Sequence, residues 1–169
     1  MKKQAFSKDL SGEVLKKLLL LHKTIAFAES VTAGLAAARL VDHAGASDVL
    51  NVSFITYAPE AKIAYTDVTA EVLETEDVVS EPVARLMASG VRKRANADVG
   101  VGITGYAGPG GGTHEIPVGT VVIGLDVDGE TETHTLHFEN ADRNEIRIRA
   151  VDETYALLFG ALERRYPGN

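Results

Sequence analysis

The sequence contains no cysteine among its 169 residues. This absence excludes disulfide bonds, cysteine nucleophiles and zinc sites built from thiolates. It also fits a reducing compartment, so we expect a cytoplasmic protein. The histidines are scattered, and His134 and His137 lie three residues apart in an expected strand, where they would face opposite sides. We therefore expect no bound metal.

Long apolar runs and an excess of basic residues are also absent. The run Leu18–Leu21 is too short to span a membrane and follows charged residues at helical spacing, so we expect neither a membrane protein nor a signal peptide. The net charge of −7 predicts no basic face for nucleic acid. The length and the hydrophobic fraction of 45% predict a single domain over residues 1–169 with one core.

Hydrophobic periodicity predicts helices that alternate with strands, followed by a hairpin. The expected helices cover residues 8–22, 32–43, 69–73 and 142–164, and two more begin at Pro59 and after Ser80. The expected strands cover residues 24–28, 51–57, 98–104, 118–127 and 130–138. Asp128-Gly129, between the last two strands, is a strong signal for a two-residue turn. This order predicts an α/β protein, a three-layer α/β/α sandwich with a mixed, mostly parallel sheet and a C-terminal antiparallel hairpin.

The first candidate site is the segment Glu29–Gly34, which follows an expected strand and opens an expected helix. Ligands bind at this edge of open α/β sheets. Free N–H groups near residues 31–34 could hold a phosphate or the oxyanion of a tetrahedral intermediate, with Ser30 as a nucleophile beside them. Taken alone, the segment favours the simpler interpretation that Ser30 or Thr32 is a helix N-cap.

The second candidate site combines a tyrosine and a lysine. Tyr57 ends an expected strand, and Lys62 follows about one helical turn later. A lysine can activate a serine, as in Ser-Lys hydrolases, provided that the amine is neutral. Its pKa would have to fall from about 10.4 to near 7–8, through burial or a nearby cation. The alternative is a solvated lysine on a helix face, as most lysines are.

The third candidate site is the glycine-rich segment Gly102–Gly112, directly after an expected strand. Its free backbone N–H groups and low bulk would let it lie against a nucleotide phosphate or sugar, and the alternative is a flexible surface loop. Gly100, Gly102 and Gly105 match the G-x-G-x-x-G pattern, but no helix follows at once, so we reject dinucleotide binding. Glycines inside the strand indicate that something approaches its backbone closely.

The fourth candidate site opens the last expected helix. Asp142 and Glu145 have the spacing of a capping box. Arg143 and Arg147 are one turn apart and could bind a phosphate. Salt bridges on an exposed helix face are an equal alternative.

Taken together and in order, these segments resemble the CinA C-terminal domain family over roughly residues 10–165. The matching segments are Glu29-Ser30-Val31-Thr32-Ala33-Gly34, Tyr57 with Lys62, Ser80-Glu81-Pro82, Gly105–Gly112, Pro117-Val118-Gly119-Thr120, and Asp142-Arg143 with Arg147. Each segment alone is a weak signal, but six in order at the family's spacing are specific.

The resemblance implies an amidohydrolase, in its stand-alone form, that deamidates nicotinamide mononucleotide to nicotinate mononucleotide and ammonia in pyridine nucleotide recycling. Ser30 would be the nucleophile, Lys62 its base, and Tyr57 would assist the proton transfers or orient the lysine. The implied oxyanion-hole and substrate-binding residues are Thr32, Ala33, Gly34, Thr104, Gly105, Gly108, Gly112, Arg143 and Arg147. No cofactor is implied, and the expected partners are the small nucleotide substrate and further copies of the chain, as a homodimer or larger.

Five positions depart from the family's pattern. Val31 replaces the family cysteine, Ala33 the first motif glycine, Ile116 a common lysine and Ala141 a glycine, while Tyr106 stands where a smaller aliphatic residue is usual. A mechanism that needs the thiol is therefore impossible in this chain. Because several of these positions would lie in the pocket wall, the alternative function is a catalytically degenerate, nucleotide-binding paralogue, and a purely structural domain is a third possibility.

Overall fold

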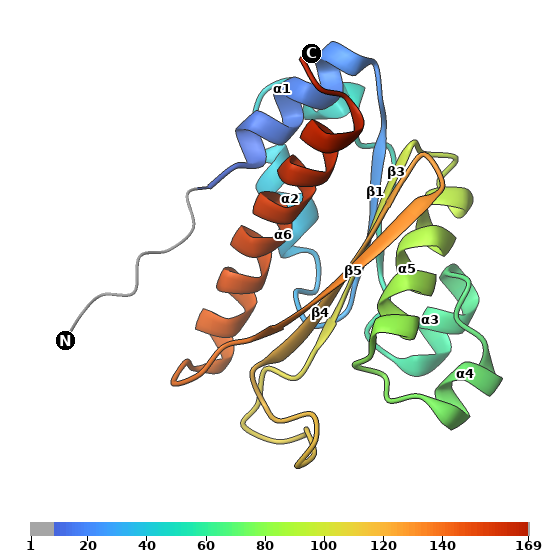
Figure 1. Ribbon diagram of the computed structural model, residues 1–169, viewed down its shortest axis with the longest axis vertical. Helices are drawn as coiled ribbons and strands as arrows, with labels where there is room; N and C mark the ends of the chain where they lie inside the picture. Colours follow the sequence, from blue (N-terminus) through green and yellow to red (C-terminus); the bar gives the residue numbers. More distant parts are fainter. Residues whose placement is uncertain (1–8, 169) are drawn as a thin grey trace.

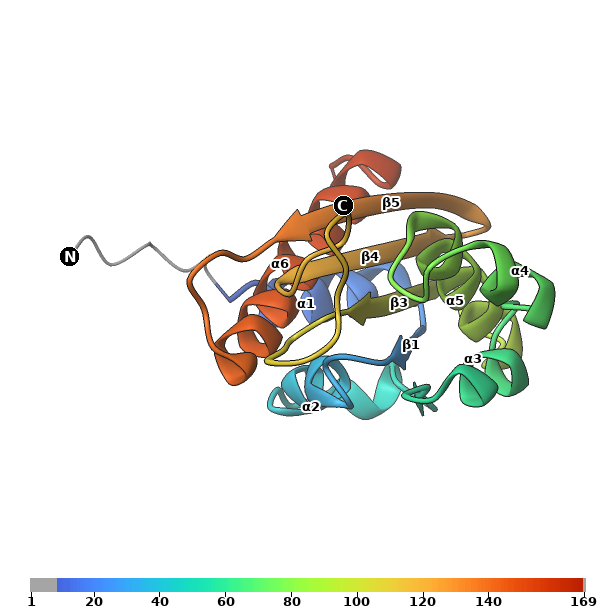
Figure 2. The same cartoon turned by 90° about the horizontal axis from the view of Figure 1, so that it is seen from below.

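The computed structural model describes residues 9–168, which form three layers with a five-stranded sheet as the middle one. One face of the sheet is covered by α1 (Ser11–Leu21), α2 (Leu35–Val41) and α6 (Arg143–Arg165), and the other by α3 (Pro59–Tyr65), α4 (Ala70–Thr75) and α5 (Glu81–Arg94) (Figure 1; Figure 2). The predicted three-layer sandwich is therefore confirmed. Within residues 9–168, no helix has both the length and the apolar character that a membrane span needs.

The sheet has the strand order β2-β1-β3-β4-β5. Its strands are β1 (Ile25–Glu29), β2 (Phe54–Ile55), β3 (Val99–Gly105), β4 (Thr120–Val127) and β5 (Glu130–His137). β2, β1 and β3 run parallel, and β4 and β5 continue the sheet antiparallel, as predicted. Glu29 pairs with both Ile55 and Ile103, so the carboxyl ends of the three parallel strands lie side by side. The segments that follow these strands therefore meet at one edge of the sheet.

Local signals in the sequence explain several element boundaries. Asp128 and Gly129 have φ values of 53° and 92°, both in the left-handed region that a type I′ hairpin turn requires. The Asp142 carboxylate accepts hydrogen bonds from the N–H groups of Asn144 and Glu145, both at 2.9 Å, and so caps α6. Ser80 caps α5 in the same way.

Two predicted elements are shorter in the structure. The helix predicted over residues 32–43 covers only Leu35–Val41, because the chain first makes a turn in which Ala33 and Gly34 have φ values of 49° and 95°. The strand predicted over residues 51–57 covers only Phe54–Ile55, because β1 pairs with it at two positions. Both corrections fall where the chain enters the candidate site.

The glycine-lined face of β3 contacts α5. A Cβ atom added at Gly100 would lie 2.1 Å from the Ala88 carbonyl oxygen, and one at Gly102 would lie 2.6 Å from that of Ala84. Gly124 of β4 meets the same Ala84 oxygen at 2.2 Å. The close contact that the sequence predicted is therefore with the backbone of α5. This helix packs directly against the sheet because glycine has no side chain.

The larger hydrophobic core lies between the sheet and the layer of α1, α2 and α6. Phe27 of β1 and Tyr155 of α6 are fully buried there, with ring centroids 6.3 Å apart. The Tyr155 hydroxyl donates a hydrogen bond of 2.6 Å to the Ala36 carbonyl oxygen of α2. These contacts hold α6 against α2, so that the first turns of α6 reach the segment that follows β1.

Candidate active site

The structure brings Ser30 and Lys62 into direct contact. Ser30 is the first residue after β1, and Lys62 lies in the middle of α3, whose start is fixed by Pro59 at its first position. The Lys62 Nζ atom lies 3.0 Å from the Ser30 Oγ atom. Both side chains are buried, with 2% of Lys62 and 8% of Ser30 exposed. The alternative of a solvated lysine on a helix face is therefore excluded.

Backbone carbonyl groups surround the rest of the lysine amine. Nζ also donates to the carbonyl oxygens of Thr56 at 2.9 Å and Tyr57 at 3.4 Å. No carboxylate within residues 9–168 forms an ion pair with it. Burial without a countercharge lowers the pKa of Lys62 from 10.5 to about 8, because desolvation disfavours the ammonium form.

These contacts fix where the lone pair of the neutral amine points. A neutral amine has two N–H bonds and one lone pair, and a carbonyl oxygen can only accept a hydrogen bond. The two N–H bonds therefore go to the carbonyls of Thr56 and Tyr57. The lone pair is left facing Ser30 Oγ, whose O–H can donate to it. This is the arrangement that a general base needs before it takes a proton from a serine.

The N–H groups expected to form an oxyanion hole are partly occupied. The carboxylate of Glu29, which is 1% exposed, accepts hydrogen bonds from the N–H groups of Gly34 at 2.9 Å, Ala36 at 3.1 Å and Ala37 at 2.9 Å. The Ala33 N–H donates to the Ser30 carbonyl oxygen at 3.1 Å. Ala33 and Gly34 therefore cannot serve as donors without breaking these bonds, which corrects the sequence expectation.

Two other N–H groups in the turn are not occupied. Those of Val31 and Thr32 have no hydrogen-bond acceptor within the described part of the chain, and Val31 lines the pocket beside Ser30. They are the donors nearest to the nucleophile in sequence. Of the N–H groups near residues 31–34, only those of Val31 and Thr32 therefore lack an acceptor; Val31 lines the pocket, whereas Thr32 is fully buried and does not.

The two arginines of the fourth candidate site have different surroundings. Arg143 lines the pocket, where it donates to the Tyr57 hydroxyl at 3.0 Å and to the Gly108 carbonyl oxygen at 2.6 Å. Arg147 lies outside the pocket lining and donates through Nε to the Val31 carbonyl oxygen at 3.0 Å and through Nη2 to that of Thr32 at 3.2 Å. The expectation that both could bind a phosphate is therefore corrected for Arg147, whose guanidinium is occupied by backbone.

Tyr57 contributes to the site through two different groups. Its backbone carbonyl contacts the Lys62 amine, whereas the residue as a whole is 57% exposed and its hydroxyl accepts from Arg143. The phenol thus lies at the mouth of the pocket, away from the lysine–serine contact. The structure thus places the main chain of Tyr57, and not its phenol, against the lysine.

The glycine-rich loop forms one wall of the pocket, which has a volume of about 230 Å³. Thr104, Gly105 and Gly108 line it, and the Thr104 hydroxyl donates to the Val78 carbonyl oxygen at 2.8 Å. Gly112 does not line it, since its Cα packs against the loop's own backbone, where an added Cβ would lie 2.9 Å from Val118 N. The structure therefore brings three of these four residues to the site.

Sequence reasoning did not identify the wall formed by residues 77–79. Val78 and Val79 line the pocket, and the Tyr106 hydroxyl donates to Asp77 Oδ1 at 2.9 Å. Asp77 Oδ1 also accepts from the Val79 N–H at 2.7 Å. Burial and the Asp77 carboxylate raise the pKa of Tyr106 to about 12, so the phenol stays a donor at neutral pH. Tyr106 thereby ties the glycine loop to the 77–79 segment, a long-range contact without a local sequence signal.

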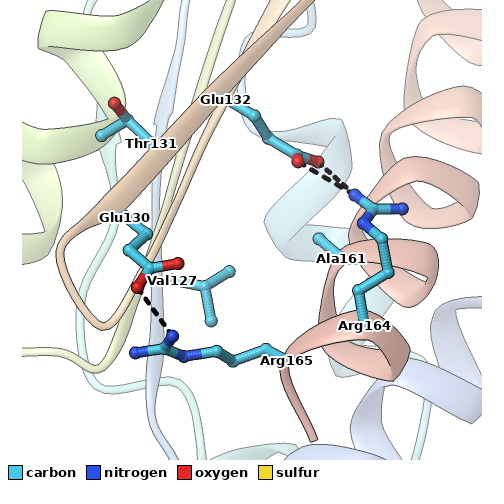
Figure 3. Close-up of a pocket in the computed structure, with 7 residues that line it drawn as sticks. All are labelled: Val127, Glu130, Thr131, Glu132, Ala161, Arg164 and Arg165. Atoms are coloured by element: carbon cyan, nitrogen blue, oxygen red, sulfur yellow. Dashed lines mark hydrogen bonds and ion pairs between the residues drawn. The ribbon is translucent and has the colours of Figure 1, made fainter. Parts of the chain in front are cut away.

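A second cleft, of about 290 Å³, lies between β5 and the C-terminal end of α6 (Figure 3). Its arginines are paired with acids, Arg165 with Glu130 at 2.7 Å and Arg164 with Glu132 at 2.8 Å. It shares no lining residue with the pocket at Ser30. Within residues 9–168, no group of three or more histidine, aspartate or glutamate side chains is placed to hold a metal ion. The pocket at Ser30 therefore remains the candidate active site.

The fold and the Ser30–Lys62 pair define a three-layer α/β protein with a buried serine–lysine site at the carboxyl edge of its sheet. The family model of the CinA C-terminal domain matches residues 7–162. The chain therefore belongs to the CinA C-terminal domain family.

Known relatives agree with this assignment. A protein of Alkaliphilus metalliredigens with a competence-damage inducible name is 45% identical over 150 residues, which are 89% of this chain and 36% of that protein. A CinA-like protein of Mycobacterium avium is 44% identical over 161 residues, which cover 92% of this chain and 37% of the relative. The chain thus spans little more than a third of the length of these curated relatives.

Solved structures of the superfamily share the fold. The competence/damage inducible protein CihA of Agrobacterium tumefaciens is 35% identical with a TM-score of 0.88, and the match covers 95% of this chain and 99% of that one. A CinA superfamily protein of Klebsiella pneumoniae is 32% identical with a TM-score of 0.87, over 92% of this chain and 96% of the other.

Proposed function

We propose that the protein is an amidohydrolase that converts nicotinamide mononucleotide to nicotinate mononucleotide and ammonia by a Ser-Lys mechanism. The observation that carries this proposal is the buried contact between Lys62 Nζ and Ser30 Oγ, with two carbonyls directing the amine's lone pair toward the serine. The lowered pKa of Lys62, about 8, gives the base a neutral fraction near physiological pH. The substrate itself is suggested by the family resemblance.

In the first half of the reaction, the Ser30 O–H proton passes to Lys62 Nζ as Oγ attacks the amide carbon. The carbonyl oxygen becomes an oxyanion, for which the Val31 N–H, in the pocket lining and without an acceptor, is the available donor. The Lys62 ammonium then protonates the leaving nitrogen, the C–N bond breaks, and ammonia departs. Ser30 is left as an acyl ester.

In the second half, water attacks the ester carbon and gives a proton to neutral Lys62. The carbon–Oγ bond breaks, Oγ regains the proton from Lys62, and the carboxylic acid leaves. The sum is amide plus water to acid plus ammonia. The same lysine serves as base and acid in both halves, as a Ser-Lys site requires.

Arg143 is the better placed arginine for the substrate phosphate. It lies in the pocket lining, its two hydrogen bonds go to neutral acceptors, and it forms no ion pair within residues 9–168. An uncompensated guanidinium favours an anionic group. A pyridine ring below it would lie among the apolar side chains of Val31, Val78 and Val79.

The test is ammonia release from nicotinamide mononucleotide by metal-free protein, with Ser30→Ala as the matched control. We expect the wild type to release ammonia and the variant to release it more slowly by about 1,000-fold or more. Equal turnover by both would reject Ser30 as the nucleophile. Calorimetric binding of the nucleotide without turnover would instead favour the degenerate, nucleotide-binding paralogue.

Assembly as a homodimer or larger and a cytoplasmic location also remain proposals that the family resemblance supports. Light scattering on the protein as it elutes from a size-exclusion column tests the assembly. A single species with the mass of one chain, 18.0 kDa, would reject it.

A further inference from the structure

The turn that carries the nucleophile is held by charged side chains on both sides. Arg147 donates to the carbonyl oxygens of Val31 and Thr32, and the Glu29 carboxylate accepts from the N–H groups at the start of α2. Between them, Ala33 has a left-handed φ of 49°, a conformation that costs an alanine about 1 kcal/mol or more. Such a turn persists only when its surroundings determine it.

The peptide between Val31 and Thr32 connects Arg147 to the reaction. This peptide is trans, so its C=O and its N–H point in opposite directions. Its carbonyl oxygen, that of Val31, is held by Arg147 Nε at 3.0 Å. Holding this carbonyl fixes the conformation of Val31, which lines the pocket and whose own N–H has no acceptor within the described residues. Thr32, at the other end of the peptide, is fully buried and does not line the pocket.

The neighbouring peptide has the same arrangement. The Ser30 carbonyl oxygen accepts from Ala33 N–H, and the Val31 N–H of that peptide is left free. The Val31 N–H, next to the nucleophile, is thus unoccupied while both carbonyls are fixed. A fixed backbone N–H group beside a nucleophile can stabilise a developing oxyanion.

The charge of Arg147 strengthens this arrangement. A charged guanidinium makes stronger hydrogen bonds to carbonyl oxygens than a neutral donor does, so the Val31 carbonyl is held firmly. Arg147 has no ion pair with a carboxylate within residues 9–168, so no acid offsets its charge. Its third hydrogen bond, to Asn144 Oδ1 at 3.4 Å, is with a neutral side chain of its own helix.

We infer that Arg147 is a positioning residue for the oxyanion site, which fixes the Val31–Thr32 peptide and with it the Val31 N–H, and does not contact the substrate phosphate. This inference rests on the proposed Ser-Lys function. It separates the roles of two arginines one helical turn apart: Arg143 acts on the substrate, and Arg147 acts on the backbone beside Ser30.

The experiment compares Arg147→Gln with Arg143→Gln on two substrates, nicotinamide mononucleotide and nicotinamide riboside, which lacks the phosphate. We expect Arg147→Gln to lower kcat about 100-fold on both substrates with KM changed less than about threefold, because a misplaced catalytic group costs about that much. Arg143→Gln should raise KM for the phosphorylated substrate alone. Arg147→Lys, which can reach one carbonyl, should recover part of kcat.

Opposite patterns would overturn the inference. A loss in Arg147→Gln that appears in KM and only with the phosphorylated substrate would make Arg147 a phosphate ligand. An unchanged kcat in folded Arg147→Gln would show that the arginine only stabilises the fold. Urea unfolding of each variant identifies the folded fraction, and Arg147→Lys takes the place of Arg147→Gln in these comparisons if the latter does not fold.

A substrate-independent readout separates this inference from the proposed function. A fluorophosphonate probe forms a bond to Ser30 Oγ with loss of fluoride, through a transition state that needs the same oxyanion site. If the wild type releases no ammonia but is labelled, and Arg147→Gln slows labelling at least tenfold, the proposed substrate is wrong and the inference stands. Equal labelling rates would reject the inference whatever the substrate, and absence of labelling in the wild type would reject both.

Discussion

The buried amine of Lys62 predicts a specific pH dependence of activity. The group acts as a base in its neutral form, and its pKa is lowered from 10.5 to about 8 by desolvation. With a pKa of about 8, about 10% of the amine is neutral at pH 7 and about 90% at pH 9; with the ordinary value the neutral fraction at pH 7 would be about 0.03%. We therefore expect kcat/KM to rise about tenfold between pH 7 and pH 9 and then level off.

The measurement is kcat/KM for ammonia release from pH 6 to pH 10.5 at constant ionic strength. The plateau above about pH 9 is the informative part, because a solvated lysine would give a rise of about tenfold per pH unit up to pH 10. A profile with no inflection between about pH 7 and pH 9 would refute the assignment of Lys62 as the base.

The same lowered pKa has a consequence for stability. Each pKa unit is worth about 1.4 kcal/mol, so burying the protonated amine costs the folded state about 3 kcal/mol at neutral pH. Because the unfolded state binds the proton more tightly, this cost is present in full below about pH 8 and disappears as the pH rises toward 10.5. Stability relative to a variant without the amine therefore increases with pH.

Lys62→Met provides that reference. It removes the titrating amine but leaves the carbonyls of Thr56 and Tyr57 without their donor, which adds a pH-independent cost of about 1–3 kcal/mol. We expect the unfolding free energy of the wild type minus that of the variant to increase by about 2 kcal/mol from pH 7 to pH 10 in urea titrations. A difference that does not change with pH would contradict the lowered pKa.

Three further predictions concern the pocket and the core. Tyr57→Phe should raise KM for nicotinamide mononucleotide several-fold and leave kcat nearly unchanged in steady-state kinetics. The reason is that the phenol contacts Arg143, whereas only the main chain contacts Lys62. A large fall in kcat would instead make the phenol a proton-transfer group. Tyr106→Phe should cost about 1 kcal/mol in urea unfolding, since Asp77 loses one of its two donors, and no loss would show that this bond does not hold the pocket wall. Gly124→Ala should cost about 3 kcal/mol or more, because its Cβ would lie 2.2 Å from the Ala84 carbonyl oxygen, whereas the control Gly110→Ala, with nothing within 4 Å of its Cβ, should unfold like the wild type.

Much of the architecture could be predicted because its signals are local. The Asp128-Gly129 turn, the capping residues Ser80 and Asp142, and the apolar spacing of the helices each depend on residues within a few positions of one another. Ligand binding at the carboxyl edge of parallel strands is likewise a property of the fold class. The pairing of Ser30 with Lys62 was expected through the family resemblance, and not from spacing.

The roles of charged groups inside the site could not be predicted in this way. Glu29 and Arg147 both lie in motif segments, but their sequence neighbourhoods do not show that one caps α2 and the other binds the carbonyls of the preceding turn. The Tyr106–Asp77 contact joins positions 29 residues apart and has no periodic signature. Each depends on which surfaces the folded layers bring together.

The amino-acid sequence by itself determined the order of helices and strands, the hairpin, and the presence of a hydroxyl and an amine in the right segments, because propensity, capping and periodicity act over one or two turns of chain. Tertiary structure alone decided that the amine of Lys62 is buried, that it contacts Ser30, and that Arg143 and Arg147 serve different partners. These properties depend on desolvation and on hydrogen-bond directions across distant segments, which exist only once the layers have packed.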